Sequence, residues 1–225
     1  MCGRFALYHD SATLSQHLPV DAIETDLQPR YNIAPTQGVA AVLSLPERPG
    51  PALDVLQWGL VPFWAKDARI GNRMINARAE TAAEKPAYRA AFKRRRCLVP
   101  ASGYYEWKQQ PHGKTPHYFS LLDGRPFAMA GLWEEWNSPD GELLHTCTLL
   151  TVEASRQVAP FHHRMPVILP PAAQQSWLEA DPEDRAGLES LLQPYEGGDL
   201  RIYPVSPQMN AAQWDDPSCI EPVIS

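Results

Sequence analysis

The sequence lacks the cysteine patterns that mark a zinc site or a disulfide framework. Its four cysteines lie far apart and form no CxxC pair (Cys2, Cys97, Cys147 and Cys219), whereas structural zinc sites and disulfide-rich domains need closely spaced ligands or pairs. No HExxH motif occurs, and the adjacent His162 and His163 have no neighbouring cysteine. We therefore expect neither a metal ion nor any other cofactor.

Long apolar runs, a secretory signal sequence, internal repeats and low-complexity segments are also missing. A membrane-spanning helix needs roughly 20 consecutive apolar residues, so we expect no membrane contact. The expected location is the cytoplasm, which is reducing and keeps Cys2 a thiol.

Proline, in contrast, is abundant. The chain has 23 prolines in 225 residues, about twice the usual ~5%, and they are scattered, which favours short strands joined by ordered turns. Its 44% hydrophobic and 20% charged residues are typical of a globular protein, and the length suits one domain spanning residues 1–225. We predict a single β-rich domain of the α+β class, with mainly antiparallel sheets and peripheral helices, and leave the tail after about residue 210 unassigned.

Alternation and turn signals predict where the strands and helices lie. The expected strands are Val39–Leu45, Leu53–Trp58, Cys97–Val99, Tyr104–Lys108, His117–Leu122, Phe127–Trp133, Thr146–Val152, Pro166–Leu169 and Arg201–Val205. The expected helices are Ala12–Leu18, Thr81–Arg95, Pro171–Ala180 and Pro182–Leu192. Thr81 and Glu84 have the spacing of a capping box at the start of the second helix.

The positive charge is concentrated in one segment. The net charge is −6, yet residues 64–96, which we call the basic segment, contain ten basic and three acidic residues and carry +7. A basic face on an acidic protein is compatible with nucleic-acid binding. For the run Lys93–Arg96 alone, we favour a role in solvating a helix end, where cations also suit the helix dipole.

Cys2 follows directly after Met1. Methionine removal before a small residue would leave an α-amine and a thiol on the same residue, with reference pKa values of about 7.7–8.0 and 8.5. Such a 1,2-aminothiol can attack an amide carbonyl with its thiolate. It can also condense with an aldehyde, first as a Schiff base and then as a thiazolidine ring. A cysteine that merely happens to come second is the alternative.

Three further motifs contain residues suited to chemistry, and each also has a structural interpretation. In Gly103–Lys108, alternation places Glu106 on one strand face with Tyr104 and Lys108, and Tyr105 and Trp107 on the other. The Glu106 carboxyl group could exchange protons with a substrate or simply pair with Lys108. Further motifs are Ile75–Thr81, where Arg78 could hold a phosphate or pair with Glu80, and Phe161–Pro166, a histidine-containing loop. Trp64, in a proline-rich segment, is a candidate platform for stacking an unpaired base.

Together these motifs resemble one family. The resemblance rests on Cys2–Phe5, Arg30–Pro35, Trp58–Pro62, Asn76–Thr81, Gly103–Trp107, His162–Pro166 and Pro204–Ser206. These motifs occur in the same order, from residue 2 to about residue 210, as those of the SOS-response-associated peptidase (SRAP) domain proteins. The chain therefore resembles this family, whose members process abasic sites in DNA. Members link a mature N-terminal cysteine to the ring-opened aldehyde of an abasic site in single-stranded DNA.

The resemblance implies a role for each matching residue. Cys2 would be the nucleophile, Asn76 would position the N-terminus and the sugar, and Glu106 and His162 would complete the catalytic set. His163 stands where some members carry Asp. Met209, next to Asn210, departs from a Val that is frequent in the family, so no site role is given to the tail. The DNA-binding residues would be Arg4, Arg78 and Arg164, which hold the backbone, and Trp64 and Trp107, which line the cleft.

The resemblance thus predicts a monomeric abasic-site sensor that crosslinks itself to single-stranded DNA, associates with the nucleoid when bound, and has weak lyase activity. Met1 would be removed autocatalytically or by an aminopeptidase. One alternative is an N-terminal-nucleophile amidohydrolase or peptidase using Cys2, although the chain has no Asn-Gly segment of the kind that class II glutamine amidotransferases use. Another is a plain single-strand binder, which would leave the position of Cys2 unexplained.

Overall fold

Short strands dominate the structure, as the high proline content predicts. The computed structural model describes residues 2–23, 27–45, 48–111 and 113–223. Its strands are β1 (Phe5–Leu7), β2 (Ala22–Ile23), β3 (Arg30–Ile33), β4 (Gly38–Leu43), β5 (Ala52–Trp58), β6 (Asn76–Arg78), β7 (Arg96–Ala101), β8 (Gly103–Gln110), β9 (Gly113–Leu121), β10 (Phe127–Asn137), β11 (Leu143–Glu153), β12 (Arg164–Pro166), β13 (Ile168–Leu169) and β14 (Leu200–Pro204).

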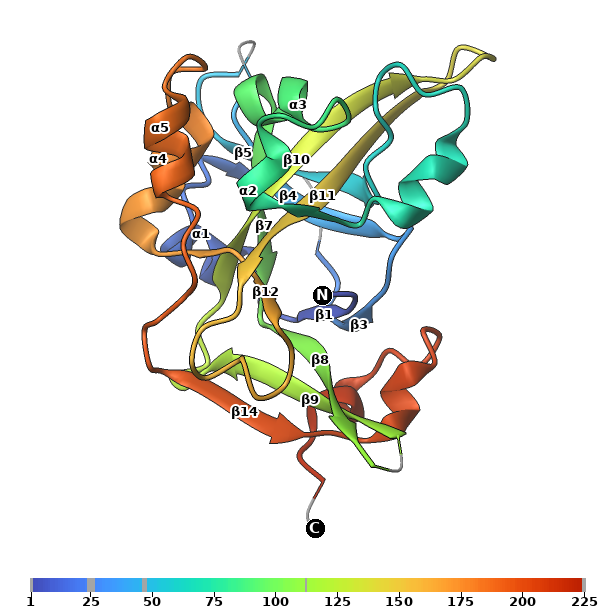
Figure 1. Cartoon of the computed structure of the whole chain (residues 1–225), viewed down its shortest axis with the longest axis vertical. Coiled ribbons are helices and arrows are strands. Elements are labelled where there is room, and N and C mark those ends of the chain that lie inside the picture. Colours follow the sequence, from blue (N-terminus) through green and yellow to red (C-terminus); the bar gives the residue numbers. More distant parts are fainter. Residues whose placement is uncertain (1, 24–26, 46–47, 112, 224–225) are drawn as a thin grey trace.

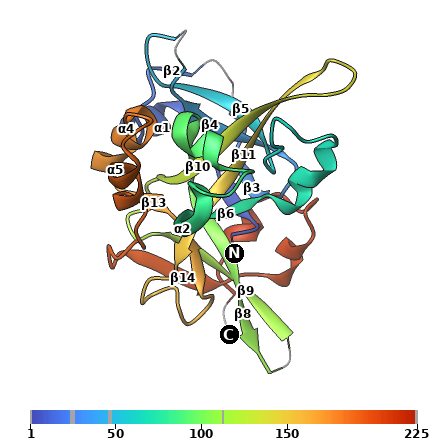
Figure 2. The ribbon, with the colours of Figure 1, turned by 45° about the horizontal axis from the view of Figure 1, so that its top comes forward.

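The helices are short and lie at the periphery (Figure 1). They are α1 (Ser11–His17), α2 (Ala79–Ala82), α3 (Arg89–Arg94), α4 (Pro171–Glu179) and α5 (Arg185–Ser190), with 3₁₀ turns η1 (Ala68–Arg73), η2 (Pro207–Asn210) and η3 (Pro217–Ile220). Figures 1 and 2 both show α1, α4 and α5 together on one side of the barrel described next. Within the described ranges, no helix is both long and apolar enough to cross a bilayer.

Five strands of the larger sheet close into a small barrel. Its order is β5, β4, β7, β10 and β11, with antiparallel pairing between each of these neighbours. The barrel is closed by a short parallel contact between β11 and β5, at Thr146–Gln57 and Cys147–Trp58. Closure removes the exposed edges that such a sheet would otherwise present. The predicted α+β class with mainly antiparallel sheets is confirmed.

A second sheet, in the order β14, β9, β8, β1 and β3, lies below the barrel in Figure 1. Strands β7 and β8 are nearly continuous, and Ser102 separates them where the chain passes from barrel to sheet. At the start of β8, a Cβ on Gly103 would lie 2.3 Å from the Tyr118 ring and 2.6 Å from the Phe119 carbonyl. Only glycine permits this close approach of β9 to the start of β8, and on its other side β8 pairs with β1.

Two buried clusters fill the molecule. The main core lies in and around the barrel and includes the fully buried Trp58 and Trp177. A smaller cluster lies on the other face of β8 and includes Tyr105, Tyr118 and Met209, with Trp107 packed against it. The N-terminal strand β1 contributes to both clusters, Phe5 to the main core and Ala6 to the smaller one. The start of the chain is therefore held between two packed layers.

Several predicted elements need correction. The predicted helix Thr81–Arg95 is two short helices, α2 and α3, separated by a turn region that contains Pro86, because proline disfavours the helix interior. The predicted capping box is wrong, since Thr81 lies inside α2, whose N-cap is Arg78 without a side-chain cap bond. The helix predicted from Pro182 begins at Arg185. Sequence analysis missed β1, β2, β3 and β6.

The basic run at the end of α3 is structural. Arg96 is buried, and its guanidinium donates to the carbonyls of Phe92, Lys93, Trp177 and Ala180 at 2.6–3.1 Å. The prediction that this run merely solvates a helix end is therefore wrong for Arg96.

Candidate functional site around Cys2

Cys2 lies at the junction of the barrel and the second sheet, three residues before β1 begins. Its side chain is fully buried, and the Sγ–H donates to the Arg4 carbonyl at 3.7 Å. Burial, reinforced by the nearby Glu106 carboxylate, raises the pKa of the Cys2 thiol well above its ordinary value. The thiol is therefore protonated near neutral pH and needs a proton acceptor before it can act as a thiolate.

Asn76 holds the backbone of Cys2. It is the first residue of β6, which pairs in parallel with β11, and its Nδ2 amide donates to the Cys2 carbonyl at 2.8 Å. The Oδ1 atom of Asn76 is buried and has no hydrogen-bond partner among the described residues. A buried acceptor of this kind is costly unless a ligand or the reacting amine supplies a donor. The structure thus brings Asn76 and Cys2 together, as the family resemblance implies.

Glu106 is the carboxylate of the site. Strand alternation on β8 is as predicted, because Tyr104 packs into the main core while Tyr105 and Trp107 face the smaller cluster. Glu106 is only 3% exposed and lies close enough to Cys2 and Tyr104 to raise the pKa of both side chains, in addition to the larger effect of burial. A buried carboxylate beside a thiol can accept and return protons.

His162 lies close enough to Glu106 for the two side chains to interact electrostatically. It lies in the turn before β12, and the Arg164 backbone N–H donates to its Nδ1 at 2.9 Å. The same Nδ1 also lies 3.1 Å from the Arg164 carbonyl, so either ring tautomer finds a backbone partner at Arg164. Burial lowers the pKa of His162, and the Glu106 carboxylate opposes that shift. His163 is exposed and stacks on His162, with ring centroids 4.3 Å apart.

These four residues come from widely separated parts of the chain. Charge coupling or hydrogen bonding links Cys2, Asn76, Glu106 and His162 into one site. The site contains the protonated thiol of Cys2, the Glu106 carboxylate and the His162 imidazole. It also contains the Asn76 amide, whose Oδ1 has no hydrogen-bond partner among the described residues. This set can move protons and hold an amine or a carbonyl. Within the described ranges, no group of three His, Cys, Asp or Glu residues could hold a metal ion.

The three predicted phosphate-binding arginines differ in their surroundings. Arg164 is mostly buried and makes a two-pronged pair with Glu80, at 2.6 and 2.8 Å, so a phosphate would have to compete with that carboxylate. Arg4 donates to the Asn32 side chain and to two carbonyls of the C-terminal tail. Arg78 is exposed, and it does not form the predicted pair with Glu80, whose partner is Arg164. Among the three, Arg78 has the side chain that is most available to a ligand.

The predicted aromatic residues also lie in different settings. Trp64 is 51% exposed, and the neighbouring Phe63, which sequence analysis missed, is 58% exposed. They follow β5. A hollow beside Trp64 is lined by Trp64, Ala65, Lys66, Asp67, Arg69, Ile70, Asn72 and Arg73. Trp107 is partly buried, and its indole N–H donates to Asn210 Oδ1 at 2.8 Å.

The hollow beside Trp64 is close to the reactive residues along the chain. Arg73, in its lining, lies three residues before Asn76, so their Cα atoms are at most about 11 Å apart. Arg69 pairs with Asp67 at 2.5 Å, whereas Lys66 and Arg73 have no carboxylate partner among the described residues. Two cations beside exposed aromatic rings are the combination that binds phosphates and stacks unpaired bases.

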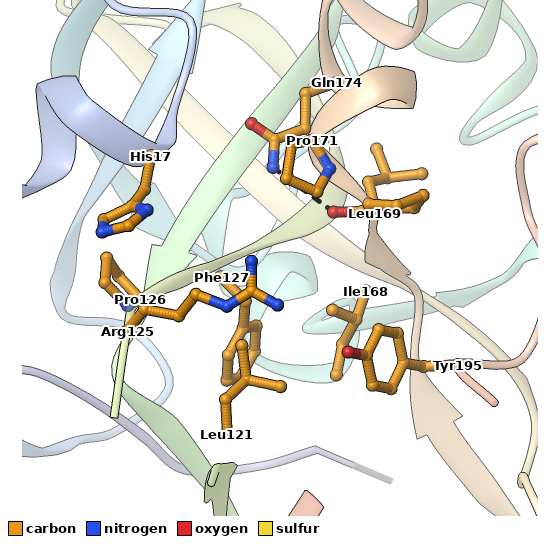
Figure 3. A pocket seen from close by; sticks show the side chains of 11 residues that line it. His17, Leu121, Arg125, Pro126, Phe127, Ile168, Leu169, Pro171, Gln174 and Tyr195 are labelled. Carbon is orange, nitrogen blue, oxygen red and sulfur yellow. Dashed lines mark hydrogen bonds between the residues drawn. The ribbon is translucent and has the colours of Figure 1, made fainter. Parts of the chain in front are cut away.

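A separate pocket lies away from these residues. It is lined by side chains of α1, the start of β10 and the β13–α4 junction, and Figure 3 shows Arg125 extending among Leu121, Phe127 and Ile168. Arg125 already pairs with Asp123 at 2.9 Å and lies 3.7 Å from Asp199. Its charge is therefore balanced, and the pocket includes none of the predicted site residues.

Sequence analysis assigned no role to the tail, yet the tail contacts the site. Carbonyls of Met209 and Asn210 accept from Arg4, and Asn32 reaches the same segment. The motif Arg30–Pro35 was part of the family resemblance but its Asn32 received no function. Because most of these contacts use backbone carbonyls, the tail sequence carries no recognisable signal for them.

The chain is similar to a known protein family and to several proteins of known name. The model of a family described as SOS response associated peptidase (SRAP) matches residues 1–212. The abasic site processing protein YoqW of Bacillus subtilis is 40% identical over 224 residues, which cover 98% of this chain and 99% of YoqW. The abasic site processing protein HMCES of Gallus gallus is 31% identical over 265 residues, covering 99% of this chain and 78% of HMCES.

Among solved structures, a protein from Bacteroides thetaiotaomicron superimposes with a TM-score of 0.85 at 25% identity. The match covers 99% of this chain and 100% of that one.

Proposed function

The chain belongs to the SRAP family, and from this we propose that it recognises abasic sites in single-stranded DNA and links itself to them covalently through Cys2. The observation that carries the proposal is the burial of Cys2 beside Asn76 and Glu106, with His162 electrostatically coupled to Glu106. A surface cysteine would need none of these neighbours. Removal of Met1 would free the α-amine of Cys2 at this point.

The proposed reaction begins at the amine. An abasic deoxyribose opens to an aldehyde, the Cys2 amine adds to C1′, and loss of one water gives an imine. The thiol sulfur then adds to the imine carbon while its proton passes to the nitrogen, closing a thiazolidine ring. The raised pKa of the thiol favours this order, because the amine is the group available as a nucleophile before the thiol is deprotonated.

Each neighbouring residue has a part in this scheme. Glu106 accepts the proton released as the amine attacks and returns it to the departing water. The Oδ1 of Asn76 accepts an N–H of the amine and so orients its lone pair towards the aldehyde. His162 assists opening of the sugar ring or reversal of the link. Slow β-elimination from the imine would give weak lyase activity.

The DNA would bind along the basic segment. Exposed Phe63 and Trp64 offer stacking surfaces, and Lys66, Arg73 and Arg78 supply positive charge. A duplex presents no free base faces, so single-stranded DNA should bind more tightly, and binding should weaken as salt rises. Equal affinity for both forms, measured by fluorescence anisotropy at two salt concentrations, would contradict this part of the proposal.

The rival function is amide hydrolysis by Cys2, and serine at position 2 separates the two. In an amidohydrolase, Cys2→Ser leaves a weaker nucleophile of the same kind. In the crosslinking scheme it keeps the amine but removes the sulfur that locks the ring. We expect the wild type to form a heat-stable adduct with abasic single-stranded DNA, with a mass equal to protein plus DNA minus water.

The Cys2→Ser variant should give little stable adduct, yet it should be trapped as an imine when borohydride is added. Retention of Met1 should abolish both products, and Cys97→Ser, at a buried cysteine of β7 in the main core, is the matched control. An equally heat-stable Cys2→Ser adduct formed without reductant would rule out the thiazolidine mechanism.

A further inference from the structure

Asn32 is a fully buried polar residue that the proposed mechanism leaves unused. It lies on β3, which pairs with β1 next to Cys2, and its side chain is 0% exposed. Its Nδ2 amide is 2.8 Å from the Met209 carbonyl, 3.1 Å from that of Ala211 and 2.7 Å from that of Trp214. One side chain thus gathers three carbonyls from the C-terminal tail under the N-terminal strand.

The other end of the Asn32 amide holds Arg4. Asn32 Oδ1 accepts from Arg4 Nη1 at 2.9 Å, and the Arg4 guanidinium also donates to the carbonyls of Met209 and Asn210 at 3.0 and 3.1 Å. The guanidinium therefore directs three of its N–H donors at three acceptor oxygens. Its neighbours are the tail and β3, so Arg4 joins three segments of the chain.

Asp215 completes the arrangement. Its carboxylate accepts from the backbone N–H groups of Tyr31 and Asn32 and pairs with Arg30. The tail therefore contacts β3 through its own side chain as well as through its carbonyls. We call Arg4, Asn32, Asp215 and the carbonyls of Met209, Asn210, Ala211 and Trp214 the tail clamp.

The tail clamp acts close to the reacting atoms. Arg4 is two residues from Cys2, so their Cα atoms are at most about 7 Å apart, and the Arg4 carbonyl accepts from the Cys2 thiol. Fixing the Arg4 side chain fixes the backbone from which Cys2 extends toward Asn76 and Glu106. A displacement of about 1 Å at a reacting group can cost on the order of 10²-fold in rate.

From these contacts we infer that Asn32 is a positioning residue for the reaction of Cys2, and that it works through Arg4 and the C-terminal tail. The inference rests on the proposed crosslinking function. It assigns Arg4 a different task from that implied by the family resemblance, because three of its N–H donors are directed at Asn32 and the tail. It also makes residues 209–215 part of the machinery that sets the geometry of Cys2.

Asn32→Asp tests the inference with little change in shape. It keeps an acceptor for Arg4 but places an oxygen against the three tail carbonyls. We expect the single-turnover rate of crosslinking to fall about tenfold or more, with affinity for single-stranded DNA containing a tetrahydrofuran abasic analogue within about twofold of wild type. Asn137→Asp, at an exposed asparagine of β10, is the matched control and should leave both quantities unchanged.

A positioning role predicts non-additivity with Glu106. If Asn32 acts by placing Cys2 against Glu106, then Asn32→Asp should slow a Glu106→Gln protein by less than about twofold, because the aligned partner is already lost. The inference would be overturned if the double variant slowed crosslinking by the product of the two single-variant factors. It would also be overturned if the Asn32→Asp protein crosslinked at the wild-type rate. A wild type that forms no adduct would instead overturn the proposed function.

Arg4→Gln gives a second test that does not depend on whether Asn32→Asp folds. On single-stranded DNA, each phosphate contact made by an arginine contributes roughly 0.7 to the slope of log affinity against log salt concentration. The tail clamp predicts an unchanged slope and a crosslinking rate at least about tenfold lower, with Arg156→Gln, an exposed arginine, as control. A reduced slope at an unchanged saturating rate would refute the positioning role.

Discussion

Replacing Glu106 with glutamine should separate the proton-transfer role of this residue from its effect on the Cys2 thiol. The carboxylate is almost fully buried, and glutamine has the same shape without the charge. Loss of general acid–base catalysis typically costs ~10²–10⁴-fold, equivalent to about 3–5 kcal/mol of barrier. We therefore expect the single-turnover rate of crosslinking at pH 7 to fall within this range, while the affinity for single-stranded DNA stays near normal.

The same substitution should have the opposite effect on the thiol itself. Because the Glu106 carboxylate raises the pKa of Cys2, its removal should lower that pKa and increase the thiolate fraction at any given pH. Alkylation of Cys2, followed by peptide mass spectrometry at pH 8, should then be as fast as in wild type or faster. Glu135→Gln, at an exposed carboxylate on β10, is the control for both assays.

The two measurements together decide the role of Glu106. Slower crosslinking with undiminished alkylation is the expected result. Crosslinking reduced by less than about threefold would refute the assignment of Glu106 as the proton carrier. Equal losses in crosslinking and alkylation would indicate that the substitution had disturbed the position of Cys2, and would also contradict the reasoning.

Further predictions concern binding, pH and stability. Trp64→Ala should weaken binding to single-stranded DNA by about 1–3 kcal/mol, the usual value of one stacked base, in a titration where Leu122→Ala, another exposed apolar residue, has no effect. His162→Ala should slow crosslinking or its reversal more than His163→Ala does, and equal effects would contradict the assignment. Since burial lowers the pKa of His162, a requirement for its neutral form predicts a rate that is constant above about pH 6.5 and falls at some lower pH. Arg96→Met leaves carbonyls without their donor and should reduce the free energy of unfolding by roughly 3 kcal/mol in urea denaturation, without changing the rate per folded molecule.

Strand periodicity was sufficient to predict which face of β8 carries the Glu106 side chain. Residues 104–107 alternate between two faces of one strand, and both faces are buried by different clusters. The position of Glu106 near Cys2 depends instead on the pairing of β8 with β1, the strand that follows Cys2. That pairing is a tertiary effect, and no local pattern in the sequence indicates it.

Short elements were harder to predict. β1, β3 and β6 have only three or four residues each, too few for a period of two to be distinguished from chance. Yet they carry or adjoin Cys2, Asn32 and Asn76. Prediction of the helix Thr81–Arg95 failed for a different reason, because propensity over the whole window favoured helix while Pro86 interrupts it.

The tail illustrates a more general limit of sequence reasoning at this site. Met209 departs from the residue expected there, which argued against a role for the tail, but the contacts from Met209 to Arg4 and Asn32 are made by its carbonyl. Any residue other than one that distorts the backbone presents the same carbonyl. The Met209 side chain meanwhile packs in the smaller cluster with Tyr105 and Tyr118, where apolar residues of similar size are interchangeable at modest cost. Variation of the side chain at this position is therefore compatible with a fixed function of its backbone, and the signal for the tail lies in the buried Asn32 that binds it.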